Sequence, residues 1–512
     1  MNNAPQSYWI DSTMSPSFPT LTEDVHVDVA IIGGGIVGIS TGYMLSKQGV
    51  NVAILEADRI LHATTGHTTA KVTSQHGLIY SKIKKQFNME MAKQYADANE
   101  TAIREIAVIV QTNDIACDFV HQDAYVYTQQ TDNLEKIKEE VEIANELGIK
   151  ASFVEELPIG IPIKGAVRFE NQAQFHPRKF LIPLADKIIA NGSKIYEQTR
   201  VVRLEEDEHT LLTEQGHKVT ADKIIIASHY PCINKPGFYF TRIHTERSYV
   251  VAVRTKEKYP GGMYINAEDP TRSLRNQQTE EGELILVGGE NHKTGQGEDT
   301  RVHYQALVDY AHSHFTVEDI PYRWSTQDCM TLDDLPYVGQ FTANSPHLYV
   351  ATGFGKWGMT NSVASAMVLR DLIIDGKSPW QEVYSPARKT SLQSMGTFIS
   401  QNANVAKELL AGKMTLPSSN GELQRGEGKV IEYKGKRAGA FLDQQGKLHV
   451  VDTTCTHMGC ELQWNAAETS WDCPCHGSRF SYTGDVVEGP AVRPLRFHDD
   501  VNTVGKLLTE QF

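Results

Sequence analysis

The stretch that decides the C-terminal fold runs from Cys455 to Ser478 and reads CTHMGCELQWNAAETSWDCPCHGS. It contains four of the chain's seven cysteines. Cys455 and His457 form a C-x-H pair, and Cys473 and His476 form a C-x-x-H pair further along. Two cysteines and two histidines are the ligand set of a [2Fe–2S] cluster in which one iron takes two thiolates and the other two imidazoles. The same residue types also suit a structural zinc ion.

Two extra cysteines bear on this choice. Zinc needs no cysteine beyond its ligands, yet each loop carries a further one, Cys460 or Cys475. Both loops resemble those of the Rieske iron–sulfur proteins, whose respiratory members carry CTHLGC and CPCHGS. The resemblance implies that Cys460 and Cys475 form a disulfide that holds the loops together. It also implies four cluster ligands, which are Cys455, His457, Cys473 and His476. We therefore favour a one-electron carrier over a zinc site.

The residues around the loops extend the resemblance. Ser478 matches the family serine whose hydroxyl hydrogen-bonds a cluster sulfur and raises the reduction potential. Phe480 stands where respiratory members carry a tyrosine, so one such hydrogen bond is missing. Gly489–Ala491 resembles the proline loop that forms a third wall of the family's site. We expect a potential below that of respiratory members and above that of all-cysteine ferredoxins.

Length and composition indicate an ordinary protein of several domains. The chain has 512 residues, and about three domains are expected from that length. Its net charge of −14 argues against nucleic acid and anionic membranes as partners. No apolar run approaches the roughly 18 residues needed to span a bilayer, and the N-terminal stretch has no signal pattern. We expect a cytoplasmic protein without a membrane span.

A second motif lies near the N-terminus. The apolar run Val27–Ile32 leads into the glycine-rich sequence GGGIVG, followed by a helical stretch from Ile39 to Gln48. A second strand, Asn51–Leu55, then ends in Glu56. This order predicts a βαβ unit with G-x-G-x-x-G at its first turn.

Each residue of this unit has an expected role in binding an adenine dinucleotide. Gly33 permits the tight turn, Gly35 lets a pyrophosphate approach the backbone, and Gly38 allows close helix packing. The N-terminus of the following helix favours the diphosphate. Glu56 is placed to accept hydrogen bonds from a ribose diol.

Four segments, in order, resemble the D-amino acid oxidase-like family of FAD enzymes between about residues 25 and 380. They are the hydroxyl-rich stretch Ala63–Lys71, the segment from Pro177 to Val201, the D-x-x-P-x-V-G sequence Asp333–Gly339, and the strand–loop–helix His347–Thr360. The last segment favours FAD over NAD alone. The resemblance implies cofactor contacts from Thr64, Thr65, Gly66, Val201, Gly353, Gly355, Lys356, Trp357, Gly358 and Met359.

No catalytic residue stands out, and two weak candidates remain. Lys356 is the only charged residue of its glycine-rich loop and could stabilise negative charge on the reduced flavin or point outward. His67 could lie near the flavin. A covalent flavin would use Cys329 or His67, but we favour non-covalent FAD. Several residues could meet a substrate carboxylate and none is singled out; they are Arg242, His244, Arg247, Tyr249, Tyr264 and Arg275.

The sequence predicts an α/β dinucleotide-binding (Rossmann-type) FAD domain, an antiparallel α+β substrate domain and a C-terminal all-β Rieske domain. Residues 241–323 alternate like antiparallel strands, Val383–Lys413 reads as one amphipathic helix, and Pro417–Gly421 reads as a linker. The expected ranges are 25–95, 160–235 and 324–385 for the FAD domain, 96–159 and 236–323 for the substrate domain, 386–420 for a helical linker, and 421–508 for the Rieske domain.

These parts together predict an oxidoreductase. The resemblance implies oxidation of a small amine or amino acid at its C–N bond, with electrons passed singly through the cluster to an unidentified acceptor. One alternative is an electron-transfer component that feeds a partner oxygenase from an external reductant. Another is a non-enzymatic redox sensor.

Overall fold

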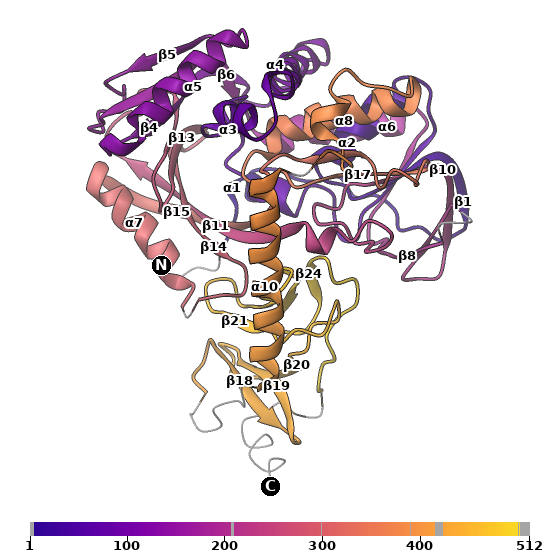
Figure 1. Ribbon diagram of the computed structural model, residues 1–512. Coiled ribbons are helices and arrows are strands. Elements are labelled where there is room, and N and C mark those ends of the chain that lie inside the picture. The colour runs from indigo at the N-terminus through magenta and orange to yellow at the C-terminus, as the bar shows by residue number, and fades with distance from the viewer. Residues whose placement is uncertain are drawn as a thin grey trace.

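The computed structural model of the chain describes residues 5–205, 209–297, 299–389, 391–414, 423–499 and 501. Figure 1 shows an α/β layer and a large second sheet side by side, with a smaller β part below them. The long helix α10 (Leu392–Met414) runs from the upper parts down along the lower one.

The first sheet is built around the glycine-rich motif. Within the described residues it has eight strands, with the order β16-β17-β10-β1-β2-β7 and β8 and β9 attached to β10. Its central strand β1 (Val25–Ile32) pairs in parallel with β2 (Val52–Leu55) and β10 (Lys218–Ile226). The other strands are β7 (Lys194–Tyr196), β8 (Val201–Glu205), β9 (Thr210–Thr213), β16 (Tyr337–Gln340) and β17 (Leu348–Thr352).

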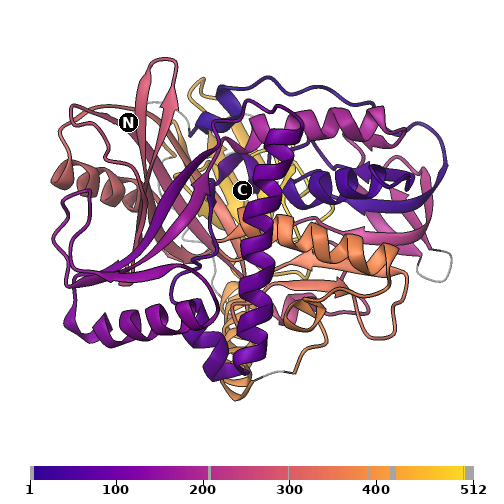
Figure 2. The same ribbon diagram turned by 90° about the horizontal axis from the view of Figure 1, so that it is seen from above.

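Helices cover this sheet, which explains why its central strands are apolar on both faces. The helix α2 (Ile36–Ser46) packs against α6 (Pro177–Ala190) and α8 (Gly358–Ile374). Pro177 occupies the first turn of α6, where a missing N–H costs nothing. Seen from above, α4 (Met89–Thr112) lies between the two large sheets (Figure 2).

The second sheet is mostly antiparallel. Among the described residues it has nine strands, with the order β15-β11-β14-β13-β12-β4-β6-β3 and β5 on β6. Its strands are β3 (Lys71–Val72), β4 (Val120–Thr128), β5 (Ala151–Val154), β6 (Gly165–Gln174), β11 (Ile243–Thr255), β12 (Met263–Asn266), β13 (Arg272–Thr279), β14 (Gly282–Lys293) and β15 (Val317–Thr331). The helices of this half are α3 (Ile79–Gln86), α5 (Leu134–Glu146) and α7 (Arg301–His314). Short helical turns are α1 (Tyr8–Asp11), η1 (Thr64–His67), η2 (Thr131–Asn133) and η4 (Tyr239–Thr241).

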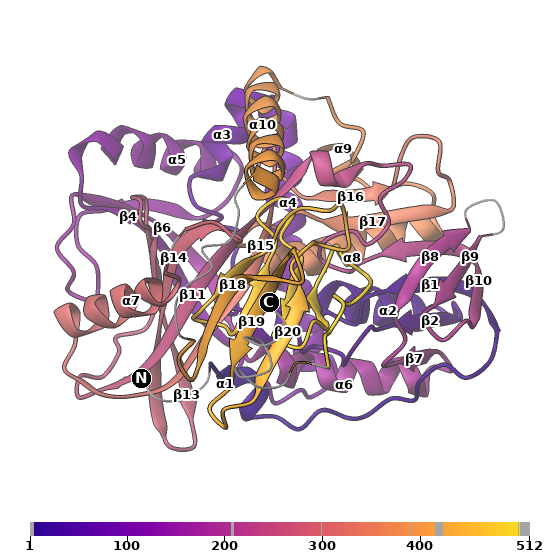
Figure 3. The same cartoon turned by 90° about the horizontal axis from the view of Figure 1, so that it is seen from below.

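The C-terminal part contains two small antiparallel sheets. One consists of β18 (Glu427–Tyr433), β19 (Lys436–Leu442) and β20 (Leu448–Asp452). The other consists of β21 (Gln463–Asn465), β22 (Ser470–Asp472), β23 (Arg479–Ser481) and β24 (Val486–Glu488). Seen from below, these strands lie under the junction of the two larger parts (Figure 3). The predicted fold class is confirmed.

Two expectations about elements are wrong. Residues 241–323 are not all strands, because α7 interrupts them. Its buried residues Tyr304, Leu307, Val308 and Ala311 follow the spacing of a helix face. The single helix expected over Val383–Lys413 is instead α9 (Gln381–Tyr384) followed by α10. Pro386 lies between them and disfavours helical backbone at the residue before it.

The domain boundaries stay a prediction. Strand β6, which the expected ranges give to the FAD domain, pairs with β4, which they give to the substrate domain. The expected linker Pro417–Gly421 lies outside the described residues. Within the described ranges, no helix combines the length and apolar character that crossing a bilayer requires.

Candidate functional site

Two tight turns hold the candidate cluster ligands. The first connects β20 to β21, and the Cys455 amide donates to the Cys460 carbonyl across it (2.8 Å). The second connects β22 to β23, and the Cys473 amide donates to the Ser478 carbonyl (2.8 Å). Both turns contain a glycine with positive φ, a conformation that other residues rarely adopt; these are Gly459 (φ 76°) and Gly477 (φ 77°).

The four candidate ligands converge between these turns. The thiols of Cys455 and Cys473 are hydrogen-bonded to each other. The rings of His457 and His476 lie 5.1 Å apart, centre to centre, and are nearly perpendicular. Nδ1 of each ring is buried and has no hydrogen-bond partner in the described part of the chain. Two sulfurs and two orphaned ring nitrogens fit a Rieske [2Fe–2S] cluster.

The histidines are also in the protonation state that metal binding requires. Burial lowers the pKa of His457 to about 4 and that of His476 to about 3. Both imidazoles are therefore neutral near pH 7, and a neutral ring can donate its nitrogen lone pair to iron.

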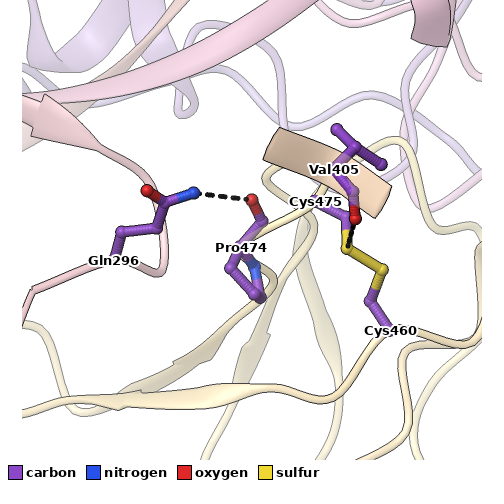
Figure 4. The surroundings of a disulfide bond; sticks show 5 residues. All are labelled: Gln296, Val405, Cys460, Pro474 and Cys475. Carbon is purple, nitrogen blue, oxygen red and sulfur yellow. Dashed lines mark hydrogen bonds between the residues drawn. A yellow bond between two sulfur atoms is a disulfide. The ribbon is translucent and has the colours of Figure 1, made fainter. Parts of the chain in front are cut away.

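A disulfide joins the two turns, as expected. Cys460 and Cys475 are bonded, with Cα atoms 6.5 Å apart. The Cys475 sulfur lies 3.9 Å from the Val405 carbonyl oxygen of α10, which places the bridge against this helix (Figure 4). The Cys473 sulfur lies within 4.8 Å of both bridged sulfurs. Because two of these three sulfurs are already bonded, we do not assign that group to a metal ion.

The serine next to the ligands is fully buried. The Ser478 hydroxyl hydrogen-bonds the Cys455 thiol and accepts from the Ala491 amide (3.0 Å). Ala491 belongs to the expected proline loop, which therefore lies against the ligand-bearing turn. Phe480 is fully buried as well and adds no polar group.

A cavity of about 1160 Å³ lies at the meeting point of the three parts. Residues of the dinucleotide motif, of the hydroxyl-rich stretch after Glu56 and of the glycine-rich loop before α8 all line it. The second sheet forms another wall. Residues of the C-terminal part line it too, namely Glu468–Ser470, Arg479, Ser481, Tyr482, Asp485–Gly489, Ala491 and Val492.

The motif glycines lie where a side chain would meet nearby backbone or would border the cavity. A Cβ at Gly33 would come within 2.6 Å of the Ala227 carbonyl oxygen, and one at Gly38 within 1.9 Å of the Gly33 carbonyl oxygen. Gly35 is the N-cap of α2 and borders the cavity, where a Cβ would meet only the Thr65 hydroxyl at 3.3 Å. The turn therefore brings bare backbone to the cavity, which fits a pyrophosphate.

Polar groups surround this end of the cavity. The Glu56 carboxylate accepts from the amides of Gly34 (2.7 Å) and Asp58 (2.9 Å), and burial raises its pKa. The Thr65 hydroxyl accepts from the amide of Ile36 at the start of α2 (3.1 Å). Glu56, Thr64, Thr65 and Val201 all line the cavity. Of the predicted contacts, Gly38, Gly66 and Gly353 do not line it.

The glycine-rich loop before α8 lines the cavity through Gly355–Met359. Lys356 does not point freely outward. Its ammonium donates to Asp328 (2.9 Å), Ser248 (3.0 Å) and Glu246 (3.2 Å). Burial opposes its charge, but the two carboxylates outweigh burial and raise its pKa.

The two candidates for covalent attachment differ in position. His67 lines the cavity, and its Nδ1 lies 2.9 Å from the Ala63 carbonyl oxygen. Burial lowers its pKa, so the ring is neutral. Cys329 is fully buried and does not line the cavity.

The arginines considered for a substrate carboxylate already have partners. Arg242 donates to the Pro386 carbonyl, and Arg275 donates to the carbonyls of Ala70 (3.0 Å) and Thr69 (3.2 Å). Arg247 is paired with Glu488 (3.1 Å). Tyr249 lines the cavity, whereas His244 and Tyr264 do not.

Sequence reasoning missed Lys71, which lines the cavity. Its ammonium donates to the Tyr264 carbonyl (2.9 Å) and to the Ser273 hydroxyl, and no ion pair is found for it in the described ranges. Burial, with a contribution from Arg275, lowers its pKa to about 7. The sequence feature that could have indicated Lys71 is that it is the only Lys, Arg, Asp or Glu between Arg59 and Lys82.

Sequence reasoning also missed a buried ion-pair network that connects the C-terminal part to the second sheet. Arg247 of β11 pairs with Glu488 (3.1 Å) and Glu468 (3.6 Å). Arg479 pairs with Asp472 (3.0 Å) and Glu488 (3.4 Å). Burial opposes the charge of Glu488, but Arg479 and Arg247 outweigh it and lower its pKa to about 2.

Comparison with known proteins identifies both parts. The profile of the family described as FAD-dependent oxidoreductase matches residues 28–372, about two thirds of the chain. The chain belongs to the FAD-dependent oxidoreductase family. The profile of the Rieske [2Fe-2S] domain matches residues 415–503 of this oxidoreductase. The expected resemblance is confirmed, and FAD and a Rieske cluster are its cofactors.

Relatives share this two-part construction or the larger part alone. The oxidoreductase is 44% identical, over 96% of its length, to YhfW of Bacillus subtilis, which is named as a Rieske 2Fe-2S iron-sulfur protein and is 97% covered. It is similar in fold to glycine oxidase from Geobacillus kaustophilus (TM-score 0.60, 17% identity), covering 72% of this chain and all of that one. L-proline dehydrogenase from P. horikoshii gives a TM-score of 0.57 at 20% identity, with coverage of 72% and 98%.

Proposed function

We propose that this protein oxidises a small amine or amino acid at its C–N bond and passes the electrons singly through the Rieske cluster to an acceptor. One observation carries this proposal: a single cavity is walled both by the dinucleotide motif and by the Rieske part. Joining two-electron chemistry to one-electron transfer requires the flavin and the cluster to lie near each other, and a cavity shared by the two parts supports this.

The names of relatives support the substrate class. Gamma-glutamylputrescine oxidoreductase from Escherichia coli is 22% identical over 70% of this chain and 85% of its own length. The structures of similar fold include enzymes named for glycine and L-proline. The names of all three point to compounds that contain a C–N bond.

We propose that Gly33, Gly35 and Glu56 bind the adenine nucleotide half of FAD, and that Thr64 and Thr65 bind its diphosphate. Gly355–Met359 would border the flavin ring, as the family resemblance implies, and they line the same cavity as Glu56. Cys455, His457, Cys473 and His476 would hold the cluster. When bound, FAD accepts a hydride and the Rieske cluster carries single electrons.

Lys71 would recognise a substrate carboxylate. It is a partly buried cation at the cavity wall, and its partners in the described ranges are neutral oxygens. A buried charge without a counter-ion is costly, and an anionic ligand would offset that cost. With a pKa of about 7 the same amine could instead take a proton from a substrate ammonium group.

The test is an anaerobic titration of purified protein with amines and amino acids, recording flavin absorbance and the Rieske EPR signal together. The proposal predicts that one compound bleaches the flavin and that the cluster becomes reduced with it. If no compound bleaches the flavin while dithionite reduces both cofactors, the substrate class is wrong. Rapid reduction by NADH would instead favour the component that feeds a partner oxygenase.

A further inference from the structure

We propose that electrons pass from the flavin cavity to the cluster within one chain, through the side chain of Gln327. This inference rests on the proposed function only in treating the two cofactors as redox partners. Gln327 belongs to β15, lines the cavity and is 1% exposed. The Gln327 side-chain amide donates to the Gly477 carbonyl (3.0 Å), and Gly477 directly follows the ligand His476.

Gln327 is held in this bridging position from several sides. Its side-chain oxygen accepts from the Thr294 hydroxyl (3.1 Å), which leaves its amide nitrogen to face Gly477. Its backbone carbonyl lies 2.9 Å from Nε2 of His229, another residue of the cavity wall. A side chain fixed at both ends keeps one geometry, and a fixed bonded route favours electron tunnelling over a fluctuating gap.

The contact between the cluster turn and the second sheet is tight. A Cβ on Gly477 would come within 2.2 Å of the Thr245 hydroxyl, and one on Gly295 within 2.7 Å of the Pro474 nitrogen. These distances leave no layer of water between the turn and the sheet. The Rieske part is therefore docked where Gln327 reaches it.

The second histidine-bearing turn faces the same way. Nδ2 of Asn234 lies 2.9 Å from Nε2 of His457, and Cys232, two residues before Asn234, lines the cavity. The Phe240 ring meets the edges of both His457 and His476, with centres 6.3 and 5.6 Å away. Both ligand rings thus face the segment Asn234–Phe240 of their own chain.

The electron balance requires two single-electron transfers from the flavin to the cluster for each substrate molecule oxidised. Breaking the C–H bond next to nitrogen and forming the C=N bond releases two electrons and two protons. The route through Gln327 carries one electron at a time to the iron held by the histidines. Each turnover therefore reduces two molecules of a one-electron acceptor outside the chain.

The experiment uses the full chain with both cofactors and no substrate. A laser flash with deazaflavin injects one electron, and its redistribution between flavin and cluster is followed by their visible absorbance. We expect a first-order rate that does not depend on protein concentration. Gln327→Leu, which keeps the bulk of the side chain but loses the amide, should lower this rate by about an order of magnitude.

Gln296→Leu is the matched control. Gln296 also donates its side-chain amide to the Cys473–Ser478 turn, at the Pro474 carbonyl (3.4 Å), but it does not line the cavity (Figure 4). Its rate should stay close to that of the unaltered protein. The cluster EPR spectrum should be unchanged in both variants, which separates a lost route from a disturbed cluster. If Gln327→Leu does not retain both cofactors, Gln327→Asn replaces it, because that variant keeps the amide but shortens its reach.

Two results would overturn the inference. One is an unchanged rate in the Gln327 variant. The other is a rate that rises with protein concentration, which would place the transfer between chains. Because the flash needs no substrate, failure of the amine titration would leave this test intact.

Discussion

Ser478 and Phe480 determine which hydroxyl groups are available to hydrogen-bond the ligand sulfurs. Ser478 hydrogen-bonds a ligand sulfur, whereas Phe480 offers none. Hydrogen bonds to ligand sulfurs stabilise the reduced, more negative cluster and raise its potential. Ser478→Ala should lower the midpoint potential, and Phe480→Tyr should raise it if the new hydroxyl reaches a sulfur. EPR-monitored redox titration measures both changes. An unchanged potential in Ser478→Ala would contradict this account of the serine.

Lys71 gives the cavity a charge that depends on pH. With a pKa of about 7, it is protonated below that pH and neutral above it. A carboxylate binds the protonated form, so KM for an amino acid should be low below pH 7 and rise above it. Lys71→Met should raise KM about tenfold to a hundredfold, because hydrogen bonds to charged groups contribute roughly 1.5–3 kcal/mol. In Lys71→Met, KM for the amino acid should also depend less on pH. Steady-state kinetics across pH tests this, and an amine without a carboxylate is the matched substrate whose KM should not change.

The residues that could be named from the sequence are those fixed by a local motif. C-x-H-x-x-C and C-x-C-H-G-S put four ligands, both bridged cysteines and one serine into two short turns, whatever the rest of the chain does. Gln327 and Gly477 are 150 positions apart, and no local pattern links them. The pair of Glu488 and Arg247 could not be predicted from the sequence either, because it depends on how the Rieske part docks onto the second sheet.

At the scale of elements, the two cluster turns depend on their covalent bridge. The disulfide closes a loop with a sequence separation of 15, for which the chain-entropy relation gives about 3 kcal/mol. Cys460→Ser should therefore let the turns open, so that the Rieske EPR signal disappears at a lower temperature. Cys117→Ser is the control, because Cys117 is a buried free cysteine far from the turns in the sequence. Equal thermal loss of the signal in both variants would show that the bridge does not stabilise the turns.

Elements with a clear pattern of apolar residues were predictable from the sequence, and those in which polar and apolar residues are mixed were not. The apolar runs of β1 and β2 and the turn between β1 and α2 follow directly from the sequence. The α7 segment RVHYQALVDYAHSH has polar residues scattered through it, so its helical spacing was hidden among neighbouring strands. The break between α9 and α10 could have been predicted from Pro386, which lies between them.

At the scale of the whole molecule, the buried network around Glu488 holds the Rieske part in place. With the Glu488 pKa lowered to about 2, its stabilising effect is complete above the ordinary value near 4.5 and is lost as pH falls from 4.5 to about 2. Glu488→Gln leaves Arg247 and Arg479 short of a counter-ion. Breaking a buried ion pair in this way costs roughly 3–5 kcal/mol.

Urea unfolding at pH 7, read from the first transition, should therefore show a large loss of stability in Glu488→Gln. The loss should shrink as pH approaches 3. Glu281→Gln removes an exposed carboxylate, 77% accessible, from its pair with Arg254 and should cost less than about 1 kcal/mol. If the two variants lose equal stability, the Glu488 network does not hold the parts together.

The wall that the Rieske part contributes to the cavity has an evolutionary consequence. Glu468–Ser470, Tyr482 and Glu488 form the side of the chamber in which the FAD enzyme would work. A chimaera that exchanged this part for an unrelated Rieske domain would open the chamber to water, even if the new domain assembled its own cluster. The two halves of the gene are therefore constrained to diverge together, and a change of substrate can begin in either one.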